Sequence, residues 1–224
     1  MQVRAILFDL DGTLTEFKVD YNLGRRMILE YARGKGYDMT GQTEGRNMHD
    51  IIEHYAAIGD ASAYADVRKY AYDLMEKLEV EGAAVTKPFP DTFAALESLQ
   101  GDGIKMGIVT NSARKAVETV MGRFPLGRYF DVITTRDDVS VIKPDPGIVK
   151  HAVDALRVGA DECFLVGDAP GDMLAAKALG IVAVGIPRGP ATKEALLDAG
   201  PDFVIDSLES LPLLVIDLKA QGKH

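Results

Sequence analysis

The chain has 224 residues, of which 47% are apolar and 26% are charged, and its formal net charge is −9. These proportions fit one globular domain, or one domain with a smaller insert, and they exclude a disordered, fibrous or disulfide-rich chain. The negative charge disfavours nucleic acid and anionic membranes as partners. A phosphate-binding site in this chain would therefore need local positive charge from a metal ion, a lysine or an arginine.

The cysteine count and the hydropathy pattern bear on where in the cell the protein is expected to reside. The single cysteine, Cys163, excludes an intrachain disulfide, and its apolar neighbours indicate a buried side chain. The run after Met1 is too short for a secretory signal, and no uninterrupted apolar stretch is long enough to span a bilayer. We therefore expect a cytoplasmic protein with no membrane partner.

The first expected element is a buried strand over residues 3–8, an apolar run with one early charge. It leads into the sequence Asp9-Leu10-Asp11-Gly12-Thr13. From there to Lys87 no strand pattern occurs, and apolar residues recur at helical spacing over residues 23–31, 48–55 and 64–78. This pattern predicts a small helical bundle, residues 17–86, inserted into a domain formed by residues 1–16 and 87–224.

Beyond Lys87, strand-like runs alternate with amphipathic helical patterns. The runs cover residues 104–109, 130–134, 163–166, 181–186 and, more weakly, 203–205. Asp145 and Pro146 are expected at the start of one helix, and Gly180 is expected to stop another. Alternation of this kind is typical of βαβ units, so we predict the α/β class with a Rossmann-like parallel sheet.

Polar residues follow several of the predicted strands, at the edge where parallel sheets bind ligands. They are Asp9, Asp11, Thr110, Asn111, Ser112, Lys143, Asp168 and Asp172; Lys143 is expected to open a helix that starts at this edge. Several carboxylates in one place repel each other unless a hard cation lies among them, and oxygen ligands favour Mg²⁺. The hydroxyl, amide and ammonium groups of the set can hold phosphate oxygens.

These residue types suit phosphoryl transfer. An aspartate can accept a phosphoryl group as a covalent intermediate, and a second aspartate two residues away can give and take the proton. Asp11 would need a pKa raised by burial and neighbouring carboxylates. Each residue alone also fits a simpler role: a turn for Asp9 and Asp11, a helix cap for residues 110–112, a solvated loop for Lys143 and a first-turn helix charge for Asp172.

Taken together, four motifs resemble the haloacid dehalogenase-like hydrolase superfamily, in its phosphoglycolate phosphatase and phosphomutase branch. They are Asp9-Leu10-Asp11-Gly12-Thr13-Leu14, Val109-Thr110-Asn111-Ser112, Lys143-Pro144-Asp145-Pro146 and Gly167-Asp168-Ala169-Pro170-Gly171-Asp172. They occur in the family's order, and the resemblance covers the whole chain, with the helical insert placed like the family's cap.

The resemblance implies a role for each matching residue. Asp9 resembles the nucleophile and a metal ligand, and Asp11 resembles the general acid and base, with its backbone carbonyl on the metal. Thr110 and Asn111 resemble the phosphate-binding pair, and Lys143 resembles the lysine that steadies the phospho-aspartate. Asp168 resembles a metal ligand, and Asp172 an outer partner of the same metal. The glycine-flanked Arg46 of the insert is a candidate for contacting an anionic substrate group.

We therefore expect a Mg²⁺-dependent phosphatase that hydrolyses a small phosphorylated metabolite, such as phosphoglycolate or a sugar phosphate, through Asp9. The sequence leaves open a phosphomutase, a pyrophosphatase or nucleotidase, and a phospho-aspartate signalling domain without turnover. It also leaves open whether the protein is a monomer or a homodimer.

Overall fold

The computed structural model describes residues 2–41 and 48–221. The chain divides into two compact units, one formed by Met1–Phe17 with Thr86–His224 and the other by Lys18–Val85. Among the described residues, no helix has both the length and the apolar character that a membrane-spanning segment requires.

The larger unit contains a six-stranded parallel sheet with the strand order β3-β2-β1-β4-β5-β6. Its strands are β1 (Ala5–Phe8), β2 (Lys105–Val109), β3 (Val132–Thr134), β4 (Cys163–Gly167), β5 (Val182–Gly185) and β6 (Phe203–Val204). This order is that of the Rossmann fold. The predicted α/β class with a Rossmann-like parallel sheet is therefore confirmed.

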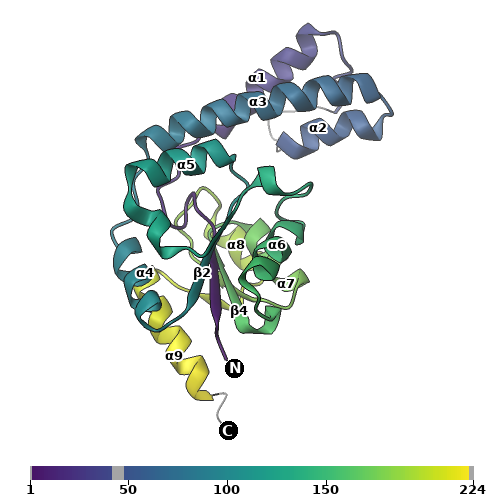
Figure 1. The fold of residues 1–224 in the computed structure, drawn as a ribbon. Helices are drawn as coiled ribbons and strands as arrows, with labels where there is room; N and C mark the ends of the chain where they lie inside the picture. Colours follow the sequence, from purple (N-terminus) through teal and green to yellow (C-terminus); the bar gives the residue numbers. More distant parts are fainter. Residues whose placement is uncertain (1, 42–47, 222–224) are drawn as a thin grey trace. The chain divides into compact units, whose positions relative to one another are not determined.

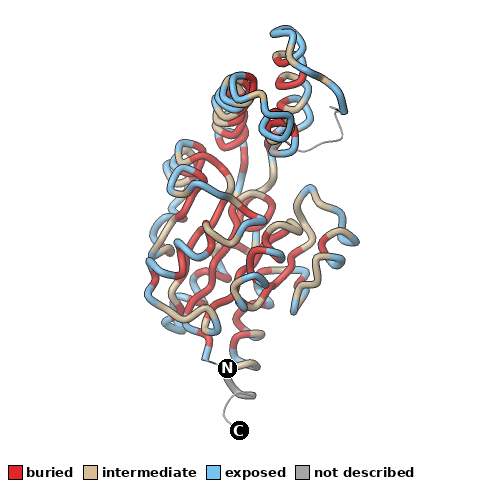
Figure 2. Tube along the Cα trace, turned by 90° about the vertical axis from the view of Figure 1, so that its right-hand side faces the viewer, coloured by how far each residue is buried: buried red, intermediate tan, exposed pale blue. Residues whose placement is uncertain are grey.

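Strand β1 lies between β2 and β4 and is buried along its whole length. Side chains alternate between the two faces of a strand. Ala5 and Leu7 accordingly pack in one cluster with apolar residues of β4, including Cys163. The same cluster contains apolar residues of the helices that follow β3 and β4. The buried segments run through the middle of this unit (Figure 2). A strand covered on both faces is continuously apolar, which is the pattern of residues 5–8.

Helices cover both faces of the sheet. The helices of the larger unit are α4 (Thr92–Gly101), α5 (Arg114–Arg123), α6 (Gly147–Leu156), α7 (Pro170–Ala178), α8 (Lys193–Asp198) and α9 (Leu211–Gln221). Short 3₁₀ turns complete it: η1 (Pro125–Tyr129), η2 (Arg136–Asp138), η3 (Ala160–Glu162) and η4 (Leu208–Ser210). Figure 1 shows α4 and α9 on one side of the strands and α6 and α7 on the other.

Two details near α6 differ from the sequence-based expectation. Helix α6 starts at Gly147, with Pro146 as its N-cap, one residue later than predicted. The Asp145 carboxylate accepts a hydrogen bond from the Gly147 backbone N–H at 2.8 Å, so it closes a turn ahead of the helix. Lys143 consequently lies in the preceding loop and does not open the helix. Gly180, in contrast, follows the end of α7 with a φ of 70°, as predicted.

The smaller unit consists of helices α1 (Tyr21–Gly34), α2 (Met48–Ala57) and α3 (Ala61–Val85). The side chain of Asp20 caps α1 by accepting a hydrogen bond from the Leu23 backbone N–H at 2.8 Å. Helix α1 approaches α3 closely at Gly24, where a Cβ atom would lie 2.9 Å from Met75 Sδ. Helical periodicity alone thus located all three helices.

Gly107 in β2 is packed tightly between side chains of the two neighbouring strands. A Cβ atom there would lie 2.7 Å from Val132 Cγ1 and 2.8 Å from Leu7 Cδ2. We expect Gly107→Ala to lower the free energy of unfolding by about 1–3 kcal/mol, because overpacking must displace rigid strand side chains. As a control, Gly122→Ala within α5 meets no heavy atom within 4 Å and should gain up to about 1 kcal/mol. Equal denaturation midpoints for the two variants would contradict this packing.

Candidate active site

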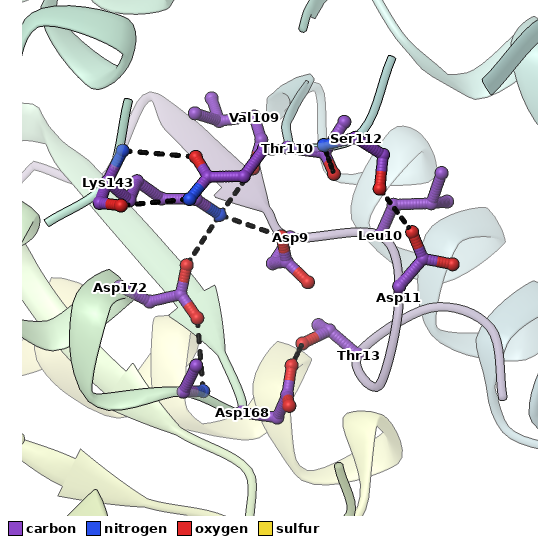
Figure 3. A network of polar contacts seen from close by, with 12 residues as sticks. Asp9, Leu10, Asp11, Thr13, Val109, Thr110, Ser112, Lys143, Asp168 and Asp172 are labelled. Carbon is purple, nitrogen blue, oxygen red and sulfur yellow. Dashed lines mark hydrogen bonds and ion pairs between the residues drawn. The ribbon is translucent and has the colours of Figure 1, made fainter. Parts of the chain in front are cut away.

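A buried lysine is the centre of the polar network at the carboxyl ends of the strands (Figure 3). The Nζ atom of Lys143 donates to Asp9 Oδ1 at 2.7 Å and to Asp172 Oδ1 at 2.6 Å. Its third hydrogen bond goes to the backbone carbonyl of Val109, at 2.8 Å. All three ammonium protons of Lys143 are therefore used, and the ammonium links the last residue of β2 to the segments after β1 and β4.

Asp168, directly after β4, supplies a third carboxylate. Its Oδ1 accepts a hydrogen bond from the Thr13 hydroxyl at 3.0 Å. Two glycines leave room for it. A Cβ atom on Gly12, which has a φ of 89°, would lie 2.6 Å from Asp168 Oδ2, and a Cβ atom on Gly189 would lie 1.7 Å from the same oxygen. Any larger residue at position 12 or 189 would have to displace this carboxylate.

Asp172 has two roles at once. Its Oδ2 accepts a hydrogen bond from the Ala169 backbone N–H at 3.1 Å, which caps α7, while its Oδ1 receives Lys143. The simpler interpretation of Asp172 as a first-turn helix charge is thus correct but incomplete. Gly167 provides space here, because a Cβ atom at that position would lie 2.3 Å from Asp172 Cγ.

The three carboxylates outnumber the one cation among them. Asp9, Asp168 and Asp172 each offer an oxygen, and these oxygens lie within 4.8 Å of one another. Exposure is only 8% for Asp9, 3% for Asp168 and 2% for Asp172. Burial and the neighbouring carboxylates raise the pKa of Asp9 well above its usual value, and they raise the pKa of Asp168 to about 7. Burial opposes the charge of Lys143, but Asp172 and Asp9 outweigh it and raise the pKa of Lys143.

This donor set fits a hard divalent cation. Three close carboxylates with one ammonium leave an excess of negative charge in a buried place, and either protons or a cation must neutralise it. Carboxylate oxygens without a sulfur or imidazole partner are the ligands of Mg²⁺ and Ca²⁺. In the described part of the chain, Asp9, Asp168 and Asp172 form the one such acidic group.

Asn111 holds the lysine's backbone in place. Its Nδ2 donates to the carbonyl of Lys143 at 2.8 Å, and its Oδ1 accepts from the Lys143 backbone N–H at 3.0 Å. Both ends of the amide are therefore engaged with a residue 32 positions away. The side chain of Asn111 therefore orients Lys143, and phosphate binding by Asn111 stays a prediction.

Asp11 lies outside the group of three carboxylates. Its Oδ2 accepts a hydrogen bond from the Ser112 hydroxyl at 2.8 Å, and the Ser112 backbone N–H donates to Thr110 Oγ1 at 3.1 Å. Burial raises the pKa of Asp11, and hydrogen bonds from Ser112 and Thr15 partly offset the effect. Ser112 thus joins the candidate phosphate-binding residue Thr110 to the candidate acid and base.

The structure brings eight of the nine candidate site residues into this network or next to it. The ninth, Arg46, lies outside the described residues. The alternative interpretation of residues 110–112 as a helix cap is wrong, since α5 starts at Arg114 after the N-cap Ala113 and has no side-chain cap. Sequence reasoning missed the contacts of Thr13 and Gly189 with Asp168. Thr13 is part of the first motif, so its contact could have been predicted. Gly189 lies in a loop that carries no motif, so nothing in the sequence pointed to it.

The raised pKa of Asp168 makes stability depend on pH. An unfolded aspartate has a pKa of about 3.9, below the value of about 7 in the fold. The folded protein therefore binds more protons in between, and this contribution to stability is present below about pH 4 and is lost as pH rises through about 7. We expect Asp168→Asn to raise the melting temperature of the metal-free protein at pH 8, by about 2–4 °C per kcal/mol gained.

Binding of Mg²⁺ should displace the proton from the Asp168 carboxyl group. Above pH 7 it should raise the melting temperature of the wild-type protein and have little effect on Asp168→Asn, whereas the exposed Asp206→Asn should behave as wild type. Scanning calorimetry at pH 5 and pH 8, with and without Mg²⁺, measures both effects. A Mg²⁺ effect that survives in Asp168→Asn would contradict the assignment of Asp168 to the cation site.

Comparison with known proteins gives a family. Residues 6–186 match the model of the haloacid dehalogenase-like hydrolases. A phosphoglycolate phosphatase of Pseudomonas fluorescens is 28% identical over 93% of this chain and 78% of its own length. The pyrophosphatase PpaX of Bacillus mycoides is 27% identical over 96% of this chain and 98% of its own.

Solved structures of the same family resemble this fold. A phosphatase of this family from Thermococcus onnurineus is 27% identical, with a TM-score of 0.60 over 95% of this chain and 98% of its own. CbbY from Rhodobacter sphaeroides, solved in complex with phosphate, is 25% identical, with a TM-score of 0.65 over 96% and 100%. The chain belongs to the haloacid dehalogenase-like hydrolases.

Proposed function

We propose that this protein is a Mg²⁺-dependent phosphatase that hydrolyses a small phosphate monoester through a phosphoryl group carried on Asp9. The observation that carries the proposal is the Lys143 ammonium, bonded at once to Asp9 and Asp172 in a group of three buried carboxylates. A lysine in this position neutralises a nucleophile and an arriving phosphoryl group together.

The side chains that would hold Mg²⁺ can be ranked by the hydrogen bonds they already make. Both oxygens of Asp172 have donors, Lys143 and the Ala169 N–H. We therefore assign direct coordination to Asp9 and Asp168 and an indirect role to Asp172. The family resemblance adds the backbone carbonyl of Asp11 as a proposed ligand. When bound, the ion supplies positive charge for the carboxylates and for the phosphate oxygens.

In the first step, a carboxylate oxygen of Asp9 forms a bond to phosphorus and the bond from phosphorus to the ester oxygen breaks. Asp11, whose pKa is raised by burial, donates a proton to the leaving oxygen from its protonated form. Thr110 and the backbone of Asn111 hold the phosphate oxygens, and Lys143 stabilises the charge on the acyl phosphate.

In the second step, the carboxylate of Asp11 takes a proton from a water molecule that attacks the phosphorus. The acyl phosphate bond of Asp9 breaks, inorganic phosphate leaves, and both aspartates return to their starting states. The hydrogen bond between Ser112 and Asp11 holds the carboxylate for this exchange. An aspartate that can change its protonation state between the two steps is what turnover requires.

The proposed substrate class rests on the relatives of this chain and not on the geometry of the carboxylate site. Relatives named phosphoglycolate phosphatase and pyrophosphatase support a small phosphorylated metabolite. We propose that the helical unit Lys18–Val85, which begins nine residues after Asp9, serves as a cap that selects the leaving group and limits water. Arg46 stays a predicted substrate contact of that unit.

A panel of phosphate compounds tests the proposal. We expect Mg²⁺-dependent phosphate release from at least one of phosphoglycolate, small sugar phosphates and pyrophosphate, and none with EDTA. Asp9→Asn should lose activity on the order of 10³-fold or more, because no acyl phosphate can form. Isomerisation of a sugar phosphate without phosphate release would assign a phosphomutase instead. No turnover with a stable phospho-Asp9 would assign a signalling domain.

Asp11→Asn separates the two steps. We expect its kcat on alkyl phosphates to fall by about 10²–10⁴-fold. An aryl phosphate has a good leaving group and needs no proton, so this variant should release one equivalent of the phenol in a burst and then hydrolyse phospho-Asp9 slowly. Asp9→Asn serves as the control and should show no burst. Full steady-state turnover by Asp11→Asn would contradict its role as acid and base.

A further inference from the structure

A second, partly buried ion pair lies next to the site, and neither of its residues belongs to the family motifs. Arg188, in the loop after β5, donates from Nη1 to both carboxylate oxygens of Asp91, at 2.9 and 2.7 Å. The two side chains are only 15% and 13% exposed. Arg188 also lies over the ring of Phe89, with its Cζ atom 4.0 Å from the ring centroid.

Asp91 is a fixed anchor for this arginine. Its Oδ2 also accepts hydrogen bonds from the Ser207 hydroxyl at 2.8 Å and from the Leu208 backbone N–H at 2.9 Å. Burial opposes the charge on Asp91, but the hydrogen bonds from Arg188, Leu208 and Ser207 lower its pKa overall. The carboxylate is therefore charged at neutral pH, and it is itself held by donors of three residues, Arg188, Ser207 and Leu208.

The free end of the arginine reaches the loop that carries the nucleophile. Nη2 of Arg188 donates to the backbone carbonyl of Thr13, whose hydroxyl donates to Asp168. The residue after the arginine, Gly189, lies directly against the same carboxylate. Arg188 thus contacts the turn at Thr13, and the residue that follows it packs against Asp168.

Stability alone is a weak reason for such a pair. A buried ion pair gains little net stability over an apolar pair of the same shape, because both charges lose their hydration. What the arginine adds is geometry, since a planar guanidinium can bind a carboxylate and a carbonyl in fixed directions at once. Such fixed directions would allow the guanidinium to hold Thr13 and Gly189 at constant distances from Asp168.

We propose that Arg188, oriented by Asp91, is a positioning residue that fixes Asp168 for cation binding. The inference rests on the proposed function insofar as Asp168 is a metal ligand. Arg188 acts through Thr13 and Gly189, in the way that residues around a metal ligand set its orientation. Loss of the arginine should leave Asp168 in place but less well ordered.

Arg188→Met tests this directly, because methionine keeps the packing over Phe89 and removes every donor. Arg188→Lys should restore function only in part, since one ammonium cannot match the two directions of the guanidinium. Arg4→Met is the matched control. It removes another arginine ion pair, with Glu162 at 3.1 Å, ahead of β1 at the opposite edge of the sheet.

Three measurements are expected to separate Arg188→Met from the control. Backbone amides of residues 10–15, where the Gly12 N–H donates to the Thr15 carbonyl at 2.7 Å, should exchange hydrogen faster in the metal-free variant. Calorimetric titration without substrate should show Mg²⁺ affinity reduced by about 10–100-fold. With substrate at saturating Mg²⁺, kcat should fall more than KM rises. Arg4→Met should match wild type in all three.

Normal exchange at residues 10–15 and normal Mg²⁺ affinity in a folded Arg188→Met protein would overturn the inference. Should that variant fail to fold, Asp91→Asn keeps the shape of the anchor and should produce the same changes more weakly; wild-type values there would overturn it equally. A wild-type protein that releases no phosphate would refute the proposed function alone, because the exchange and titration measurements need no turnover.

Discussion

The structure of the site depends on one ammonium group. Lys143 binds Asp9, Asp172 and the Val109 carbonyl with hydrogen bonds of 2.6–2.8 Å, in a place from which water is almost excluded. Removing one partner of such a pair costs about 3–5 kcal/mol, since the others remain charged and buried. The lysine therefore makes the cluster of carboxylates tolerable, and the remaining excess of negative charge makes it selective for a cation.

The fold brings these groups together because the sheet is parallel. Strands β1, β2 and β4 are neighbours, so their carboxyl ends place Asp9, residues 110–112 and Asp168 at one edge. Glycines at positions 12, 167 and 189 then let backbone and carboxylates approach to distances that a Cβ atom would forbid. Sheet topology sets the site's location, and these glycines set its size.

The sequence was sufficient for the fold class and for selecting polar residues that the structure brings together, because each strand is a short apolar run and these residues stand where the runs end. It was insufficient where a contact joins distant segments. Nothing in the local pattern reveals that Asn111 orients Lys143, 32 positions away, or that Arg188 reaches Thr13 and Asp91. The start of α6 was misplaced because Asp145 closes a turn with the same hydrogen bond that a cap would make. Long-range polar contacts have no periodicity, so pattern reasoning cannot find them.

The most direct test of the central claim is a crystal structure of the protein with Mg²⁺ and beryllium trifluoride, which mimics a phosphoryl group bonded to a carboxylate. The account predicts beryllium bonded to an oxygen of Asp9, the Lys143 ammonium in contact with a fluorine, and Mg²⁺ coordinated by Asp9 and Asp168. An adduct on another residue, or Mg²⁺ bound away from Asp168, would contradict it.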